Sequence, residues 1–233
     1  MKLLLRIFLL NFLFLFSTGT IAQEIPENEY GLKVVSSYDL YASLIENDSN
    51  QILVNLESFI PGIKKDVKYA TDDNVTGAVL YNTPGIFLRL PAAIALTQVQ
   101  EELLKSGLEL KIYDAYRPYA ITKKIWEFVL DENYAASPQT GSRHNRGCAV
   151  DLTIIVSSTG EELNMPTLFD DFSEMAHHGY NRLPVETRVN RSLLKNVMER
   201  FGFVALKTEW WHYDFKDWRD FPLMDISFDE LIK

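Results

Sequence analysis

The chain has 233 residues, of which 47% are hydrophobic and 24% charged, which suits one globular domain with a buried core. Its formal net charge of -9 argues against nucleic acid and anionic membrane as partners. The single cysteine, Cys148, excludes an intrachain disulfide, so stability must come from the core and from any bound metal.

Residues 1–22 have the pattern of a secretory signal peptide. Two basic residues precede an almost wholly apolar run at 7–16, and small residues stand before Gln23. The alternative is an uncleaved anchor, but this run is short for a membrane span of about 20 residues. We therefore predict a mature domain at 23–233 that is exported and not stably inserted in the membrane.

The first half of the mature chain predicts short elements followed by a long helix. A helix begins near residues 36–37, and apolar runs at 52–56 and 78–81 predict strands. Pro91 suits the first position of the long helix, where its missing N–H costs nothing, and Gly107 ends that helix.

The middle of the chain predicts a strand, a helix and a second strand. Residues 108–113 alternate apolar and polar side chains, the period of a half-buried strand. Pro118 opens a helix with one apolar stripe, and the breakers in 133–143 predict a loop. The apolar residues at 147–156 predict the next strand.

The last third predicts an irregular segment, a helix and a strand pair. Residues 164–188 show weak periodicity and are expected to cover a site, whereas 191–200 has helical apolar spacing. Residues 203–206 and 210–215 predict two strands or one bent strand. Without a regular βαβ rhythm, the sequence favours an α+β single domain with a mainly antiparallel sheet and flanking helices.

A possible metal half-site lies at the start of the strand at 147–156. His144 and Asp151 stand seven residues apart, with Gly147 between them to let the loop swing into the strand. A carboxylate inside an apolar strand is costly unless it is paired or binds a metal. A buried Asp151 that caps the loop, with His144 on the surface, is the alternative.

A second half-site follows far downstream, at Glu209 and His212 between two tryptophans and a tyrosine. Positions i and i+3 of a strand face opposite ways, so both side chains reach one site only if the chain turns near Glu209. Three protein ligands with an open fourth position are usual for a catalytic zinc, and a non-ligating glutamate beside them suits a general base. The alternative is a tryptophan-rich core edge with a solvated Glu209.

Other candidates are weaker from the residues alone. Cys148 is a rival ligand, but strand alternation turns it away from Asp151 and favours a small buried residue. His177 and His178 have no ligand spacing with the rest. Arg117 could stabilise an oxyanion, although an ion pair with Asp114 or another acid is the plainer interpretation.

These motifs resemble those of zinc D-Ala-D-Ala dipeptidases of the VanX type, members of a larger group of D,D-peptidases that shares a fold with the hedgehog signalling domain. The resemblance runs over about residues 50 to 220. It rests on a Ser-x-His-x-x-Gly-x-Ala-x-Asp pattern at 142–151, Tyr-Arg-Pro at 116–118 and Glu-x-x-His at 209–212. It implies a hedgehog/D,D-peptidase-like domain that hydrolyses small D,D-dipeptides with a free amino end.

The resemblance also implies residue roles. One Zn²⁺ per chain would be bound by His144, Asp151 and His212. The catalytic residues would be Glu209, as general base, and Arg117, which would steady the oxyanion. The substrate's ammonium would be held by Ser142 and Asp170.

The chain departs from the family pattern in its predicted signal peptide, which would place it in the periplasm and favour a role in cell-wall peptide turnover. Two other functions stay open. One is a zinc D,D- or L,D-carboxypeptidase acting on peptidoglycan stems, and the other is a non-catalytic, zinc-stabilised binding module. The sequence leaves the oligomeric state undetermined.

Overall fold

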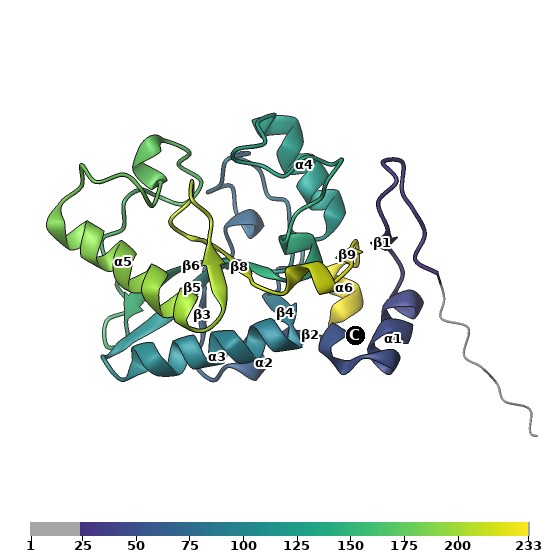
Figure 1. The fold of residues 1–233 in the computed structure, drawn as a ribbon, viewed down its shortest axis with the longest axis horizontal. Coiled ribbons are helices and arrows are strands. Elements are labelled where there is room, and N and C mark those ends of the chain that lie inside the picture. Colours follow the sequence, from purple (N-terminus) through teal and green to yellow (C-terminus); the bar gives the residue numbers. More distant parts are fainter. Residues whose placement is uncertain (1–23, 233) are drawn as a thin grey trace, which may run out of the picture.

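The structure is a computed structural model that describes residues 24–232, so the predicted signal peptide lies outside the described residues. Its centre is a five-stranded sheet of order β3-β5-β6-β8-β7 (Figure 1). The strands are β3 (Lys64–Lys65), β5 (Leu108–Asp114), β6 (Ala149–Val156), β7 (Phe203–Ala205) and β8 (His212–Phe215). Only β3 and β5 pair in parallel, and the other three pairs are antiparallel. The predicted α+β fold with a mainly antiparallel sheet is confirmed.

The three long helices flank this sheet. Helix α3 (Leu90–Leu104) packs on β5, α5 (Val185–Arg200) packs on β7, and the two helices contact each other. Helix α4 (Tyr119–Val129) lies on the opposite side of the molecule from α3 (Figure 1). The predicted helix start at Pro91 is confirmed, since proline stands in the first turn of α3.

Smaller elements surround these layers. Strand β1 (Val34–Val35) pairs in parallel with β9 (Leu223–Met224), and β2 (Leu53–Asn55) pairs antiparallel with β4 (Phe87–Arg89). The short helices are α1 (Tyr38–Asn47), α2 (Leu56–Phe59) and α6 (Phe228–Leu231). The 3-10 turns are η1 (Ser49–Gln51), η2 (Lys68–Ala70), η3 (His144–Arg146), η4 (Glu174–Ala176) and η5 (Trp218–Asp220).

Two predicted elements differ from the structure. Residues 78–81 form no strand, because the N–H groups of Leu80 and Tyr81 both donate to the carbonyl of Tyr69 instead of to a neighbouring strand. Helix α5 begins at Val185, six residues before the predicted start. Val185 and Val189 in its first turns are exposed, so these turns have no buried apolar stripe from which the sequence would predict a helix.

The register of the sheet brings three polar side chains into one row. Asp151 in β6 pairs with His212 in β8 on one side and with Asp114 in β5 on the other. A register shift between Ile112 and Asp114 accompanies this alignment at the end of β5. Neighbouring strands lie about 4.8 Å apart, so residues paired across them have side chains within contact range. The fold thus places Asp114, Asp151 and His212 side by side.

The turn at Gly147 delivers His144 to the same place. Gly147 has φ of 68°, in the left-handed region that costs other residues energy, and it follows η3 directly. The turn is closely packed, because a Cβ on Gly147 would lie 2.4 Å from Leu53 Cδ2 and 3.4 Å from the Arg89 backbone nitrogen. Arg89 N–H donates to the carbonyl of Gly147 at 2.9 Å.

Replacing Gly147 with alanine is expected to destabilise the protein. The left-handed backbone costs about 1–2 kcal/mol, and the collision with Leu53 adds roughly 1–3 kcal/mol. Gly160→Ala is the matched control, because Gly160 has φ of 74° but no atom within 4 Å of the added Cβ. Denaturant unfolding of both variants measures the difference, and equal losses of stability would contradict the tight packing at Gly147.

Candidate active site

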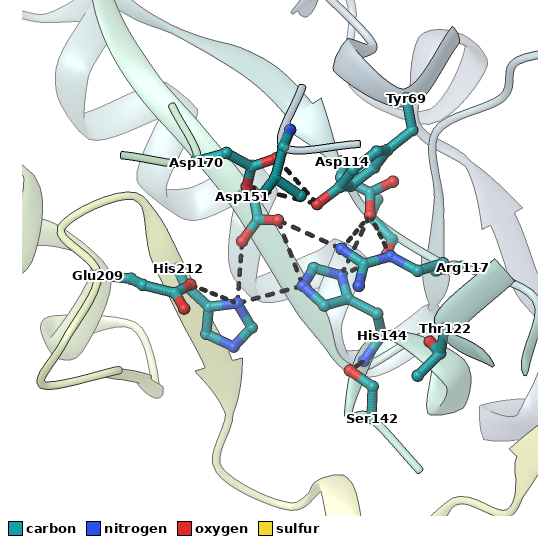
Figure 2. A network of polar contacts seen from close by, with 12 residues as sticks. Tyr69, Asp114, Arg117, Thr122, Ser142, His144, Asp151, Asp170, Glu209 and His212 are labelled. Atoms are coloured by element: carbon teal, nitrogen blue, oxygen red, sulfur yellow. Dashed lines mark hydrogen bonds and ion pairs between the residues drawn. The ribbon is translucent and has the colours of Figure 1, made fainter. Parts of the chain in front are cut away.

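His144, Asp151 and His212 gather in one buried cluster (Figure 2). His144 Nε2 lies 3.1 Å from His212 Nδ1 and 3.4 Å from Asp151 Oδ2, and His212 Nδ1 lies 2.9 Å from Asp151 Oδ1. Within residues 24–232, this is the one group of three or more such side chains whose donor atoms converge as a metal site requires. The structure therefore brings together all three predicted ligands, although their role as ligands stays a prediction.

The second nitrogen of each imidazole is held by an acceptor. His144 Nδ1–H donates to the carbonyl of Ala115 at 2.6 Å, and His212 Nε2–H donates to Asp214 Oδ1 at 3.0 Å. Such bonds fix the tautomer and orient a metal-binding histidine. They leave His144 Nε2 and His212 Nδ1 facing Asp151 as donor atoms.

The electrostatics of the cluster favour positive charge. Burial alone would lower the pKa of His212, but Asp214 and Asp151 raise it well above the usual value. Burial likewise opposes ionisation of Asp151, yet His144 and His212 hold the pKa of its carboxyl below the usual range. Asp151 is thus an anion in a site that stabilises cations.

The donor set fits zinc. Two imidazole nitrogens and one carboxylate oxygen are donors that zinc accepts in catalytic sites, where a fourth position stays open. Donors around a tetrahedral zinc, at about 2.1 Å from the ion, lie roughly 3.4 Å apart. The separations of 2.9 to 3.4 Å among these atoms are close to that value.

Arg117 makes the predicted ion pair and lies beside the cluster, while its role at an oxyanion stays a prediction. It follows β5, and its Nε and Nη2 lie 2.8 and 2.7 Å from Asp114 Oδ2, so the ion pair exists. Its guanidinium also lies 3.7 Å from Asp151 and over the ring of Tyr69, and it lines the central cavity. Tyr81 Oη–H donates to the other oxygen of Asp114 at 2.9 Å. Asp114 therefore holds Arg117 in place beside the cluster.

Glu209 stands next to the cluster without joining it. The chain turns at 207–208, as predicted, and the Glu209 Oε2 atom lies 3.9 Å from His212 Nδ1. Burial raises the pKa of Glu209 to about 8, and Asp151 and Asp170 contribute in the same direction. A buried carboxyl that titrates near neutrality is suited to accept and return a proton.

Asp170 is a further buried acid that lines the cavity. Its Oδ2 accepts hydrogen bonds from the Val75 N–H at 3.0 Å and from the Tyr69 hydroxyl at 3.2 Å. Burial raises the pKa of Asp170 to about 7. The neighbouring Asp171 does not line this cavity, and its Oδ1 accepts the N–H of Ser173.

Ser142 and Asp170 do not lie together. Ser142 Oγ accepts the N–H of His144 at 3.2 Å, and Figure 2 shows Ser142 and Asp170 on opposite sides of the three candidate ligands. Both line the cavity. The two residues were predicted to hold one ammonium group; the structure places them apart, and their role stays a prediction.

The cavity around these residues has a volume of about 120 Å³. One wall is a stack of Tyr134 on Phe172, with ring centroids 4.8 Å apart, and Phe172 leans on Trp211. Phe172 comes from the segment at 164–188, which therefore covers the site as predicted. The small volume suits a small ligand.

The rival ligands lie outside this cavity. Cys148 is buried, its Sγ–H points to the carbonyl of Arg146, and burial raises the pKa of its thiol to about 12. His177 and His178 line a different surface hollow. The sequence analysis missed Asp214 and Tyr69 as supporting residues. The sequence could have indicated Asp214, because it stands two residues after His212 on one strand and so shares the face of that histidine.

The family profile of D-Ala-D-Ala dipeptidases (Peptidase_M15) matches residues 49–229. The chain belongs to this family. It is 35% identical over 176 residues to the D-alanyl-D-alanine dipeptidase of Escherichia coli K12, covering 76% of this chain and 91% of that relative. It is 32% identical over 201 residues to the D-alanyl-D-alanine dipeptidase of Enterococcus faecium, covering 76% of this chain and 96% of that relative.

Solved structures give weaker likenesses. The LD-carboxypeptidase LdcB has a TM-score of 0.40 and 20% identity, over 83% of this chain and 85% of that one. VanYB in complex with D-alanine-D-alanine has a TM-score of 0.39 and 16% identity, over 60% of this chain and 77% of that one. Family membership rests on the sequence relatives, and it confirms the predicted resemblance to zinc-dependent peptidases.

The hydrogen bond from His212 to Asp214 is expected to strengthen metal binding. Asp214→Asn should lower zinc affinity about 10–100-fold, because the carboxylate orients the imidazole and makes it a better donor. Competition with a chromophoric chelator measures the affinity. Asp217→Asn, at an exposed position just after β8, is the control and should bind zinc like the wild type. Equal affinities in all three proteins would contradict this supporting role.

Proposed function

We propose that the protein is a zinc-dependent dipeptidase that hydrolyses D-Ala-D-Ala to two molecules of D-alanine. The observation that carries this proposal is the small cavity in which Glu209, Arg117 and Asp170 surround the cluster of His144, Asp151 and His212. Membership of the D-Ala-D-Ala dipeptidase family supports the choice of substrate.

The charged residues at the centre of the cavity have the following roles in this reaction. His144, Asp151 and His212 would hold the zinc ion, which would supply Lewis acidity for the scissile carbonyl and for the attacking water. Glu209 takes a proton from the attacking water and returns it to the leaving nitrogen as the C–N bond breaks. Arg117, fixed by Asp114, donates to the oxygen that becomes negative in the tetrahedral intermediate.

The substrate's size and charge follow from the walls. A cavity of about 120 Å³ is small beside the roughly 300–1,000 Å³ of pockets for larger ligands, so a dipeptide suits it better than a peptidoglycan stem. Asp170, with two donors already on its Oδ2, offers a buried acid for the free ammonium of the dipeptide. A zinc that served only the fold would need neither Glu209 nor Arg117.

We further propose that the chain is exported and acts on dipeptide released in wall turnover. The support is the sequence of residues 1–22, with its basic start and apolar run. Residues 24–232 contain no helix with the length and hydropathy of a membrane span. Recovery of the uncleaved chain from the cytosol would contradict export.

The proposed activity predicts cleavage of free D-Ala-D-Ala but not of its N-acetyl derivative by zinc-loaded protein spanning 23–233. The acetyl group removes the ammonium that Asp170 would bind and adds bulk to a closed cavity. Release of D-alanine measures both reactions. Cleavage of the blocked peptide would favour the carboxypeptidase, and cleavage of neither peptide by zinc-loaded protein would favour the binding module.

Glu209→Gln is expected to abolish turnover while leaving zinc bound. The amide keeps the shape of the side chain but cannot accept the proton, so kcat should fall by about 100-fold or more. Metal content by atomic absorption and kcat are measured together. Loss of zinc from this variant would mean that Glu209 is a ligand and not the base.

The wild-type activity should also rise with pH on its acid side, because Glu209 must be ionised to act as a base. The pKa of about 8 for Glu209 sets the upper limit of that rise, since a bound dication lowers the pKa of a neighbouring acid.

A further inference from the structure

Arg143 lies between two residues of the site and has no role in the reaction described above. It stands between Ser142 and His144 in sequence, and it lines the cavity. Its side chain is 44% exposed, whereas that of Arg117 is 10% exposed. Arg143 is therefore at the rim of the cavity, where a substrate enters, and not within the buried cluster.

The guanidinium of Arg143 is held in place by two contacts but retains N–H groups for a further hydrogen-bond acceptor. It stacks over the ring of Trp218, with its Cζ 5.0 Å from the ring centroid, and its Nε lies 3.6 Å from Asp214 Oδ2. Within the described residues its contacts are this ion pair and this ring, and it donates no hydrogen bond. Asp214 also accepts a hydrogen bond from His212, so it is not dedicated to Arg143. A planar guanidinium in this state keeps N–H groups for a bidentate partner.

The charges that line the cavity are unevenly distributed. The acids Glu132, Asp151, Asp170 and Glu209 face two arginines, Arg117 and Arg143. Arg117 is held by Asp114 beside the cluster, where the proposed reaction assigns it to the developing oxyanion, so Arg143 is left as the arginine for a second anion. Asp170 lies on the far side of the candidate ligands from Ser142, the chain neighbour of Arg143 (Figure 2).

This polarity matches a dipeptide zwitterion, in which the ammonium and the carboxylate lie at opposite ends and the scissile bond lies between them. We propose that Arg143 binds the C-terminal carboxylate of the substrate. The proposal rests on the proposed function and deepens it, because it defines the substrate class as peptides with a free terminal carboxylate directly after the scissile bond. Arginine is well suited to this task, since its N–H groups match the two oxygens of a carboxylate.

The test compares D-Ala-D-Ala with its C-terminal amide in four zinc-loaded proteins: wild type, Arg143→Gln, Arg143→Lys and Arg219→Gln. Arg219 is the matched control, because it stacks on the same Trp218 ring at 4.2 Å but does not line the cavity. Metal content is measured for each protein, because Arg143 also lies near Asp214. Steady-state kinetics give kcat and KM separately.

We expect Arg143→Gln to raise KM for D-Ala-D-Ala about tenfold, the effect of losing one partly exposed charge-assisted hydrogen bond, with kcat changed little. The lysine variant should recover part of the loss, and Arg219→Gln should behave as wild type. The amide should be a poor substrate of the wild type and should be affected little by Arg143→Gln.

Equal losses for acid and amide in Arg143→Gln, or an unchanged KM for the acid, would overturn the carboxylate site. Failure of the wild type to cleave D-Ala-D-Ala would instead overturn the proposed function. In that case calorimetric binding of the dipeptide and its amide to wild type and Arg143→Gln still decides whether Arg143 recognises the carboxylate.

Discussion

The structure depends on how it accommodates buried negative charge at the centre of its sheet. Asp114 and Asp151 lie side by side on adjacent strands, and both are buried. A buried carboxylate is stable only with compensating partners. Arg117 compensates Asp114, and the two imidazoles compensate Asp151. The burial of these two acids therefore depends on Arg117 and on the two histidines.

The surrounding acids extend this constraint. Asp170 and Glu209 have raised pKa values because burial and the charge of Asp151 both oppose their ionisation. A dication and a substrate ammonium are the charges that would relieve this repulsion. The same arrangement therefore favours binding of a cation, and under the proposed function it would also adjust the pKa of Glu209 for its role as a base.

Local motifs in the sequence predicted most of the fold and of the site. Pro91, Pro118 and Gly147 mark boundaries through backbone rules that act within a few residues, and the structure has boundaries at or beside each. The bend before Glu209 followed from strand alternation, since Glu209 and His212 could not otherwise share a site. The grouping of His144, Asp151 and His212 needed two distant half-sites to be read together.

What the sequence could not predict depends on contacts between distant segments. Nothing near Asp170 indicates that Tyr69 and Val75, about a hundred positions earlier, hold its carboxylate. The register that sets Asp114 beside Asp151 is a property of the sheet and not of either strand. The same is true of the separation of Ser142 from Asp170, which only the assembled site reveals (Figure 2).

The separation of Ser142 from Asp170 makes the two ends of the cavity chemically different. If the proposed function holds, a substrate with its ammonium at Asp170 would extend past the candidate ligands toward Ser142 and Arg143, and Glu209 and Arg117 would line the same cavity. The Tyr134–Phe172 stack closes the cavity at its wall. On these proposals, selectivity for a short zwitterion would need no pocket for a large side chain. It would follow from two opposite charges, at Asp170 and Arg143, placed on either side of the cluster in a small cavity.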